Sequence, residues 1–145
     1  MSLALPRKVG RRIGLIALAL FFIISGANHF FNQPFYLRMM PGYLPAHKLL
    51  VQLSGLLEMA GGIGVLVPET RSLAGYGLVA LLVAVFPANV EMAIHPDRFV
   101  ASGFPLWGLY ARLPLQIPII LWAYWATRPE GSRTAQHSPG PVEIE

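Results

Sequence analysis

The sequence predicts an all-α integral membrane protein, a bundle of four transmembrane helices formed by residues 1–127. Two observations lead to this prediction. Charged residues make up only 12% of the 145 residues, about half of the roughly 25% usual in soluble domains, and hydrophobic residues make up 54%. The charged residues also avoid four long stretches, which in so small a protein have nowhere to face except lipid. Residues 128–145 are polar and rich in Pro, Gly and Ser, and we expect them to form a disordered tail.

Each predicted span is long enough to cross a bilayer. A helix rises about 1.5 Å per residue, so about 20 residues cross roughly 30 Å of hydrocarbon. The last apolar run, Leu113 to Thr127, is too short alone, and we start that span at Pro105, which places Arg112 inside the membrane. Pro114 and Pro118 each remove a backbone donor and should bend this helix. The predicted spans cover residues 13–31, 49–67, 73–94 and 105–127.

Basic residues predict the orientation of the bundle. Four of them lie between Arg7 and Arg12, directly before the first span, as in a membrane flank, so the net charge of +4 does not require a nucleic acid partner. Four spans place both termini on one side, and positive residues favour the cytoplasm. We therefore expect a multi-pass protein of the bacterial inner membrane with both termini in the cytoplasm and residues 32–48 and 95–104 outside. A signal peptide in place of the first span is an alternative, although no clear A-x-A cleavage site follows.

The residue types that the chain lacks limit its chemistry. It contains no cysteine, which excludes thiolate catalysis, disulfide exchange and cysteine-held zinc or iron–sulfur clusters. No motif for flavin, haem or nucleotide occurs, and no tight histidine spacing indicates a metal site. We therefore expect no metal and no cofactor with a recognisable motif.

Polar residues that lipid should exclude recur in all four spans at a similar depth. Three spans carry two polar residues spaced four apart, which places both on one helix face, and the third span carries an amide. Counted along the helices, these residues fall in one layer of the outer half of the membrane. The residues of this layer, which we predict to line a ligand-binding pocket, are Ser25, His29, Ser54, Glu58, Asn89, Arg112 and Gln116.

The charged members of this layer need partners. An isolated charge near the bilayer centre costs several kcal/mol, so ionisable groups there turn inward and pair. A lone Glu58 would bind a proton, whereas beside Arg112 it would stay ionised. We predict that Glu58 and Arg112 are paired, directly or through Gln116, Asn89 or water. A network that only fixes helix packing would use the same residues, so a structural and a ligand-binding role both stay open.

The outer segment, residues 32–48, is too apolar for a freely solvated loop. It combines three prolines with aromatic residues such as Phe35 and Tyr36 and with Met39 and Met40. Aromatic residues settle at the membrane interface. We expect the segment to cover the mouth of the bundle, either as a lid over the pocket or only as an anchor.

Four segments of the chain together carry a family resemblance. They are SGANHFFNQPFYLRMMPGYLPAH, LSGLLEMAGGIGVLVPETRSLAGYGL, AVFPANVEMA and RLPLQIPIILWAYW, in this order. Together they resemble the bacterial DoxX family of small four-helix membrane proteins, over about residues 13–127. The resemblance implies a link to membrane oxidoreductase complexes, since the family's name comes from a subunit associated with thiosulfate:quinone oxidoreductase. Distant eukaryotic relatives resemble assembly chaperones. No catalytic role is carried over to any residue.

The predicted pocket and this resemblance favour binding of a small lipid-soluble molecule. A quinone is the first choice, because an apolar cavity with a few polar groups would hold its ring carbonyls. The protein would then be a subunit of a membrane oxidoreductase, and any redox step would need a partner or a bound cofactor. Two alternatives stay open: a non-enzymatic scaffold or assembly chaperone, and a small permease coupled to protonation of Glu58. The small residues Ala80, Ala84 and Ala88 share one face and would also allow a homodimer. The sequence does not decide whether the protein is an enzyme.

Overall fold

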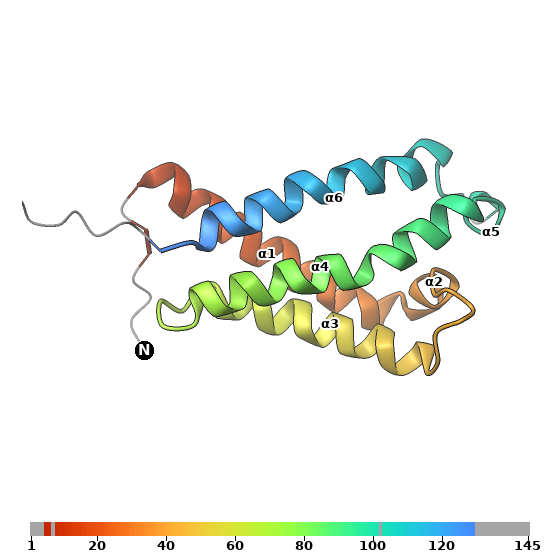
Figure 1. Ribbon diagram of the computed structural model, residues 1–145, viewed down its shortest axis with the longest axis horizontal. Helices are drawn as coiled ribbons and strands as arrows, with labels where there is room; N and C mark the ends of the chain where they lie inside the picture. The colour runs from red at the N-terminus through yellow and green to blue at the C-terminus, as the bar shows by residue number, and fades with distance from the viewer. Residues whose placement is uncertain (1–4, 7, 102, 130–145) are drawn as a thin grey trace, which may run out of the picture.

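The computed structural model describes residues 5–6, 8–101 and 103–129, and every regular element within them is an α-helix. The all-α prediction is therefore confirmed for these residues. The predicted tail lies outside the described residues from position 130 onward. In chain order the helices are α1 (Val9–Phe31), α2 (Gln33–Arg38), α3 (His47–Gly64), α4 (Arg71–Ile94), α5 (Asp97–Val100) and α6 (Leu106–Thr127) (Figure 1).

Four long helices lie where the sequence predicts spans. α1 begins earlier than expected, because Arg11 belongs to the helix and its Nε donates a hydrogen bond to the carbonyl oxygen of Ala126, 3.3 Å away. α3 ends earlier, at Gly64, and a short turn that contains Pro68 leads into α4. The short helices α2 and α5 were not predicted. Both lie at the end of the bundle opposite the α3–α4 turn (Figure 1).

Two of the described helices, not four, are apolar and long enough to cross a membrane on their own. These are α1 and α4, with mean hydropathies of 1.9 and 2.0. The prediction of four such helices was wrong because α3 has only 18 residues and includes Lys48 and Glu58, while α6 includes Arg112 and two prolines. A helix in the core of a soluble protein would also pass this test. However, only 17% of the apolar window of α4 is buried, so its side chains mostly face outward.

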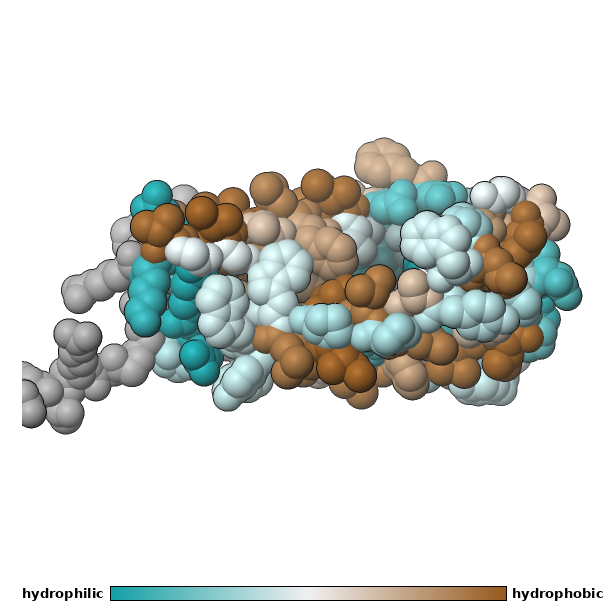
Figure 2. All heavy atoms as spheres, turned by 90° about the horizontal axis from the view of Figure 1, so that it is seen from above, coloured by the Kyte–Doolittle hydropathy of each residue, from teal (hydrophilic) through white to brown (hydrophobic). Residues whose placement is uncertain are grey.

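The outside of the bundle is hydrophobic along most of its length. Large apolar side chains such as Ile24, Leu73 and Ile117 are 67%, 75% and 64% exposed. On the face that Figure 2 shows, strongly hydrophilic residues gather mainly at the two ends of the long axis, and hydrophobic residues mixed with paler ones lie between them. Soluble monomers rarely expose apolar patches this extensive, so the surface requires an apolar environment or a partner.

Glycines allow α1 and α3 to pack closely against each other. A Cβ atom on Gly55 would lie 2.6 Å from Cβ of His29 and 2.8 Å from the carbonyl oxygen of Gly26. Farther along, a Cβ atom on Gly62 would lie 2.9 Å from the carbonyl oxygen of Ala19. No side chain fits at either crossing point, and the two helices form the most extensive packing in the molecule.

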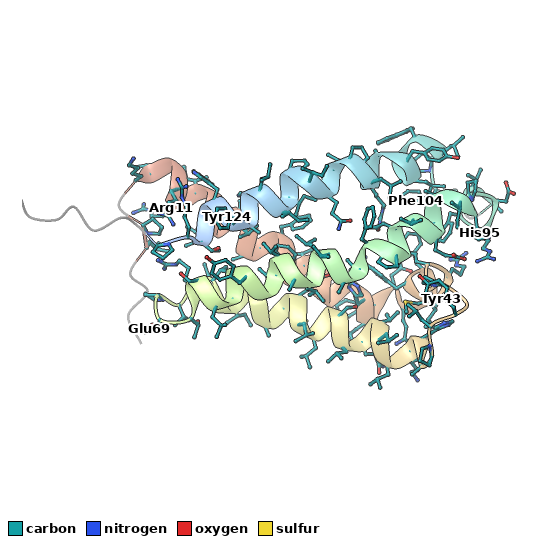
Figure 3. All side chains as sticks on the ribbon, in the orientation of Figure 1. Arg11, Tyr43, Glu69, His95, Phe104 and Tyr124 are labelled. Carbon is teal, nitrogen blue, oxygen red and sulfur yellow. The ribbon has the colours of Figure 1, made fainter. Side chains whose placement is uncertain are left out.

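Two apolar clusters fill the two ends of the bundle. We call the end with the α3–α4 turn the hairpin end, where Figure 3 labels Arg11 and Glu69, and the opposite end the far end, where it labels Tyr43, His95 and Phe104. The far-end cluster consists of Met39, Met92, Phe99 and Leu109, with Phe35, Tyr36, Ala88 and Phe104 packed against it. The hairpin-end cluster consists of Leu15, Leu18, Ala19, Phe22, Val65, Leu78, Ala123 and Ala126.

Candidate functional site

A cavity of about 700 Å³ lies between the four long helices, and its lining reaches both apolar clusters. All seven residues of the predicted polar layer line it, together with Tyr36 and mainly apolar side chains. The structure thus brings the predicted residues together at one place, and ligand binding there stays a prediction. The seven residues are Ser25 and His29 from α1, Ser54 and Glu58 from α3, Asn89 from α4, and Arg112 and Gln116 from α6.

His29 and Glu58 form a buried pair across the α1–α3 contact. His29 Nε2 and Glu58 Oε1 are 3.9 Å apart, and the two side chains are 7% and 10% exposed. His29 Nδ1 donates to the carbonyl oxygen of Ser25, 3.0 Å away, because a carbonyl can only accept. A neutral ring in this tautomer would turn a lone pair toward an ionised carboxylate. One further proton, on Nε2 or on the carboxyl, would remove this repulsion and bring the net charge of the pair to zero.

One carboxyl oxygen of this pair has unused hydrogen-bonding capacity. Glu58 Oε2 is buried, and no residue in the described part of the chain donates to it. Ser25 is a further polar neighbour of the carboxyl on the α1 side. Burial of an unsatisfied polar atom costs about 1–3 kcal/mol. A ligand donor or a water molecule in the cavity would satisfy this atom.

Arg112 does not form the predicted ion pair with Glu58. Within the described residues, its guanidinium instead lies over the rings of Phe35 and Phe104, 5.8 and 5.4 Å from their centroids. The prediction of a direct ion pair was wrong for two reasons, and a link through water stays a prediction. The glycine contact between α1 and α3 brings His29 to the carboxyl, and the unpredicted helix α2 brings an aromatic ring to Arg112.

Asn89 and Gln116 connect α4 to α6 and do not link Glu58 to Arg112. Asn89 Nδ2 donates to Gln116 Oε1 at 3.1 Å, and Gln116 Nε2 donates to the carbonyl oxygen of Leu82 at 2.6 Å. Pro87, inside α4, has no backbone N–H. The carbonyl oxygen of Val83, four residues earlier, therefore lacks its helical hydrogen bond, and the helix is loosened at this point. The amide pair therefore stabilises a weakened part of α4. Ser54 also bonds locally, to the carbonyl oxygen of Val51 at 3.0 Å.

Tyr36 is a cavity residue that the predicted pocket did not include. Its ring stacks on that of His29 with centroids 3.8 Å apart, and its hydroxyl accepts a hydrogen bond from Asn28 Nδ2 at 3.0 Å. Burial raises the pKa of the Tyr36 phenol, the charge of Glu58 adds to this, and Asn28 and Arg112 act in the opposite direction. The phenol is therefore protonated at neutral pH. Pro34, in the first turn of α2, was the sequence signal for this helix.

No metal centre is apparent in the part of the chain that the structure describes. Nowhere in it do three His, Asp or Glu side chains approach closely enough to hold an ion. Near the far end, Glu91 Oε1 lies 3.0 Å from both His95 Nδ1 and Arg98 Nη1, an ordinary surface ion-pair network.

Comparison with known proteins places the chain in a family. A family model described as a domain of unknown function, DUF8561, matches residues 18–127. The chain belongs to this family. The match begins within α1 at residue 18 and covers α3, α4 and α6 completely, so it includes every residue that lines the cavity. No curated protein and no solved structure matches the chain.

The family match corrects the resemblance to DoxX proteins, since no DoxX model matches the chain. The four quoted segments combine small, aromatic and proline residues with sparse polar ones. Closely packed apolar helices of unrelated membrane proteins also need that composition, so it does not identify a family. The expectation of an oxidoreductase partner rested on this resemblance and loses its basis. The expectation of a lipid-soluble ligand now rests on the cavity alone.

Proposed function

We propose that this DUF8561 protein is an integral membrane protein that binds a small lipid-soluble molecule in the cavity between its four long helices. The main supporting observation is the position of the cavity. Apolar clusters fill the bundle at both of its ends, while exposed side chains such as Leu57 and Leu115 belong to its lining. We therefore propose that access is from the side, where lipid would be.

The hydrophobic exterior supports the membrane assignment. α1 and α4 are apolar enough to cross alone and are mostly unburied. We propose that α3 and α6 cross beside them, since α3 packs along α1 and α6 along α4. The polar residues that lower their hydropathy, Glu58, Arg112 and Gln116, line the cavity and so avoid lipid. With four crossings, both ends of the described chain would lie on one side, and the basic residues before α1 favour the cytoplasm for that side.

We propose two side openings, at exposed residues of the lining, that would admit a molecule from the bilayer. Leu53 and Leu57 on α3 are 45% and 47% exposed and line the cavity. Phe21 on α1 and Leu115 on α6 are 41% and 53% exposed and line it as well. A water-soluble ligand would have to pass an apolar cluster at either end, whereas a lipid-soluble ligand would enter between helices.

The lining suits a molecule with an apolar body and one polar head. Ligand pockets of roughly 300–1,000 Å³ are usually apolar with a few polar groups that fix orientation. Here the polar groups are His29, Tyr36, Glu58 and Arg112, and the cavity volume of about 700 Å³ falls in this range. A quinone belongs to this class of ligand, because its carbonyl groups accept hydrogen bonds.

The test is binding of two lipid-soluble probes, decylubiquinone and palmitic acid, to the purified full chain in detergent by titration calorimetry. We expect saturable binding of at least one probe, and an affinity at least tenfold lower in Glu58→Gln or Arg112→Leu. Ile117→Ala is the control, since Ile117 is 64% exposed and does not line the cavity. Absence of saturable binding, or equal affinities in both pocket variants and the control, would contradict the proposal.

The same experiment separates this function from that of a scaffold or chaperone, which the exposed apolar helix faces would also suit. A scaffold requires those faces and not the cavity. Substitutions in the cavity would then leave probe binding unchanged, and substitutions of outward residues would reduce recovery of a membrane partner.

A further inference from the structure

We propose that the ligand of this cavity is a lipid-soluble carboxylic acid whose carboxylate binds Arg112. This inference rests on the proposed function and specifies its ligand class. It follows from the charge of the cavity wall, from the way Arg112 is held, and from the apolar remainder of the lining.

Arg112 contributes a positive charge to the cavity wall and has no carboxylate partner there. The cavity carboxylate, Glu58, lies beside His29 instead, and with one further proton on either group that pair has no net charge. Glu91 is engaged with His95 and Arg98, and among the described residues no carboxylate lies within ion-pair distance of Arg112. A half-buried guanidinium in an apolar protein gains most from a ligand that neutralises it.

The aromatic contacts of Arg112 leave its donors available. Phe35 and Phe104 lie against the guanidinium, with centroids 5.8 and 5.4 Å from its central carbon. Contacts of this kind hold the cation through the ring faces and use none of its five N–H groups. Within the described chain those N–H groups donate to no other side chain. A carboxylate is the group that this planar set of donors binds best, through two parallel hydrogen bonds.

Tyr36 supplies a second donor on the same side of the cavity. Its oxygen accepts from Asn28, so its own O–H is left to donate. Tyr36 lines the cavity together with Arg112, and its neighbour in α2, Phe35, lies against the guanidinium. A carboxylate on Arg112 has further lone pairs to accept from such a donor, whereas an ester or an alcohol provides less charge and fewer acceptors.

The remaining lining specifies an apolar tail. Leucine and other apolar side chains from all four long helices make up most of it, and both side openings are bordered by apolar residues. A long-chain monocarboxylic acid combines this tail with a single anionic head. A neutral quinone would leave the charge of Arg112 uncompensated.

The test compares palmitic acid with methyl palmitate and hexadecanol, which have the same tail and no charge. Binding to the purified full chain in detergent is measured at a pH where the acid is ionised. We expect the acid to bind at least tenfold more tightly than either neutral analogue. Butyrate, which has the head without the tail, should not compete.

Variants locate the preference. Arg112→Gln should lower the affinity for the acid at least tenfold and leave that for hexadecanol unchanged, and Arg112→Lys should keep part of the preference. Ile117→Ala, at an exposed residue outside the cavity lining, should keep the preference entire. Equal binding of acid and ester by the unaltered protein, or tighter binding of decylubiquinone than of the acid, would overturn this inference and leave the proposed function standing. Failure of every lipid-soluble probe to bind would overturn the proposed function itself.

Discussion

His29 and Glu58 matter as a pair because each side chain is stable in its position only while the other is there. The Oε2 atom of the carboxyl is buried away from solvent, and the Nδ1 atom of the imidazole is already hydrogen-bonded to the backbone. Removal of one member leaves the other buried without its polar partner. Removal of both leaves an apolar contact, which proteins tolerate far better.

The losses of stability caused by substitutions at His29 and at Glu58 should therefore not be additive. His29→Leu and Glu58→Leu should each lower the stability by about 1–3 kcal/mol, because one buried polar group is left unpaired. The double variant should be more stable than the sum of the two losses implies. Thermal unfolding of the four proteins in one detergent measures this, with Glu58→Gln as the conservative control. Strictly additive losses would show that the two side chains act independently.

The sequence predicted which residues line the site but not how they pair. Polar residues in apolar spans are conspicuous, and their depth follows from counting along a helix, which is why seven cavity residues could be named. Pairing depends on the rotation of each helix about its axis. Here Gly26 and Gly55 set that rotation for α1 and α3, and their role depends on the partner helix, which spacing along one helix does not reveal.

At the scale of the helices, the contact between Gly26 and Gly55 determines the distance between His29 and Glu58. Both glycines lie on the facing sides of α1 and α3, and a side chain at either would force the helices apart. The distance between the two polar groups therefore depends on a residue that has no polar atoms in its side chain.

Gly55→Ala should consequently lower both stability and ligand affinity. An added Cβ would lie 2.6 Å from Cβ of His29, and overpacking of this kind costs about 1–3 kcal/mol. Gly77→Ala is the matched control, since a Cβ there meets nothing within 4 Å, and alanine should stabilise this helix by about 0.5–1 kcal/mol. Thermal unfolding and probe titration measure the two effects. Equal stability of the two variants would show that the close crossing is not needed.

The long helices could be predicted because apolar runs with prolines near their ends define them almost completely. The short helices α2 and α5 could not, since four to six residues give too little periodicity to recognise. Because α2 was not predicted, the contacts of Phe35 with Arg112 and of Tyr36 with His29 were not predicted either. The number of helices apolar enough to cross a membrane alone was overestimated. A helix such as α3 contains polar residues, and these are covered only when neighbouring helices pack against it.

At the scale of the whole molecule, the number of membrane crossings is directly testable, and the absence of cysteine allows single-cysteine variants without further changes. Glu69, in the α3–α4 turn, and Asp97, in α5, are both exposed. If all four long helices cross, Asp97→Cys should react with an impermeant maleimide in intact cells, and Glu69→Cys only after permeabilisation. If α1 and α4 alone cross, the two positions should show the reverse pattern. Tyr43→Cys, 75% exposed, should react from outside in both cases and is the positive control.

The apolar clusters at the two ends have a consequence for how occupancy is controlled. If ligands enter the cavity sideways, as proposed, the concentration that governs loading is the mole fraction of ligand among the surrounding lipids. Diluting a proteoliposome suspension with buffer should leave the protein loaded, while adding empty vesicles should unload it. The bilayer then acts as the reservoir from which the protein draws, and an affinity quoted in moles per litre of water would misstate how full the site is in a cell.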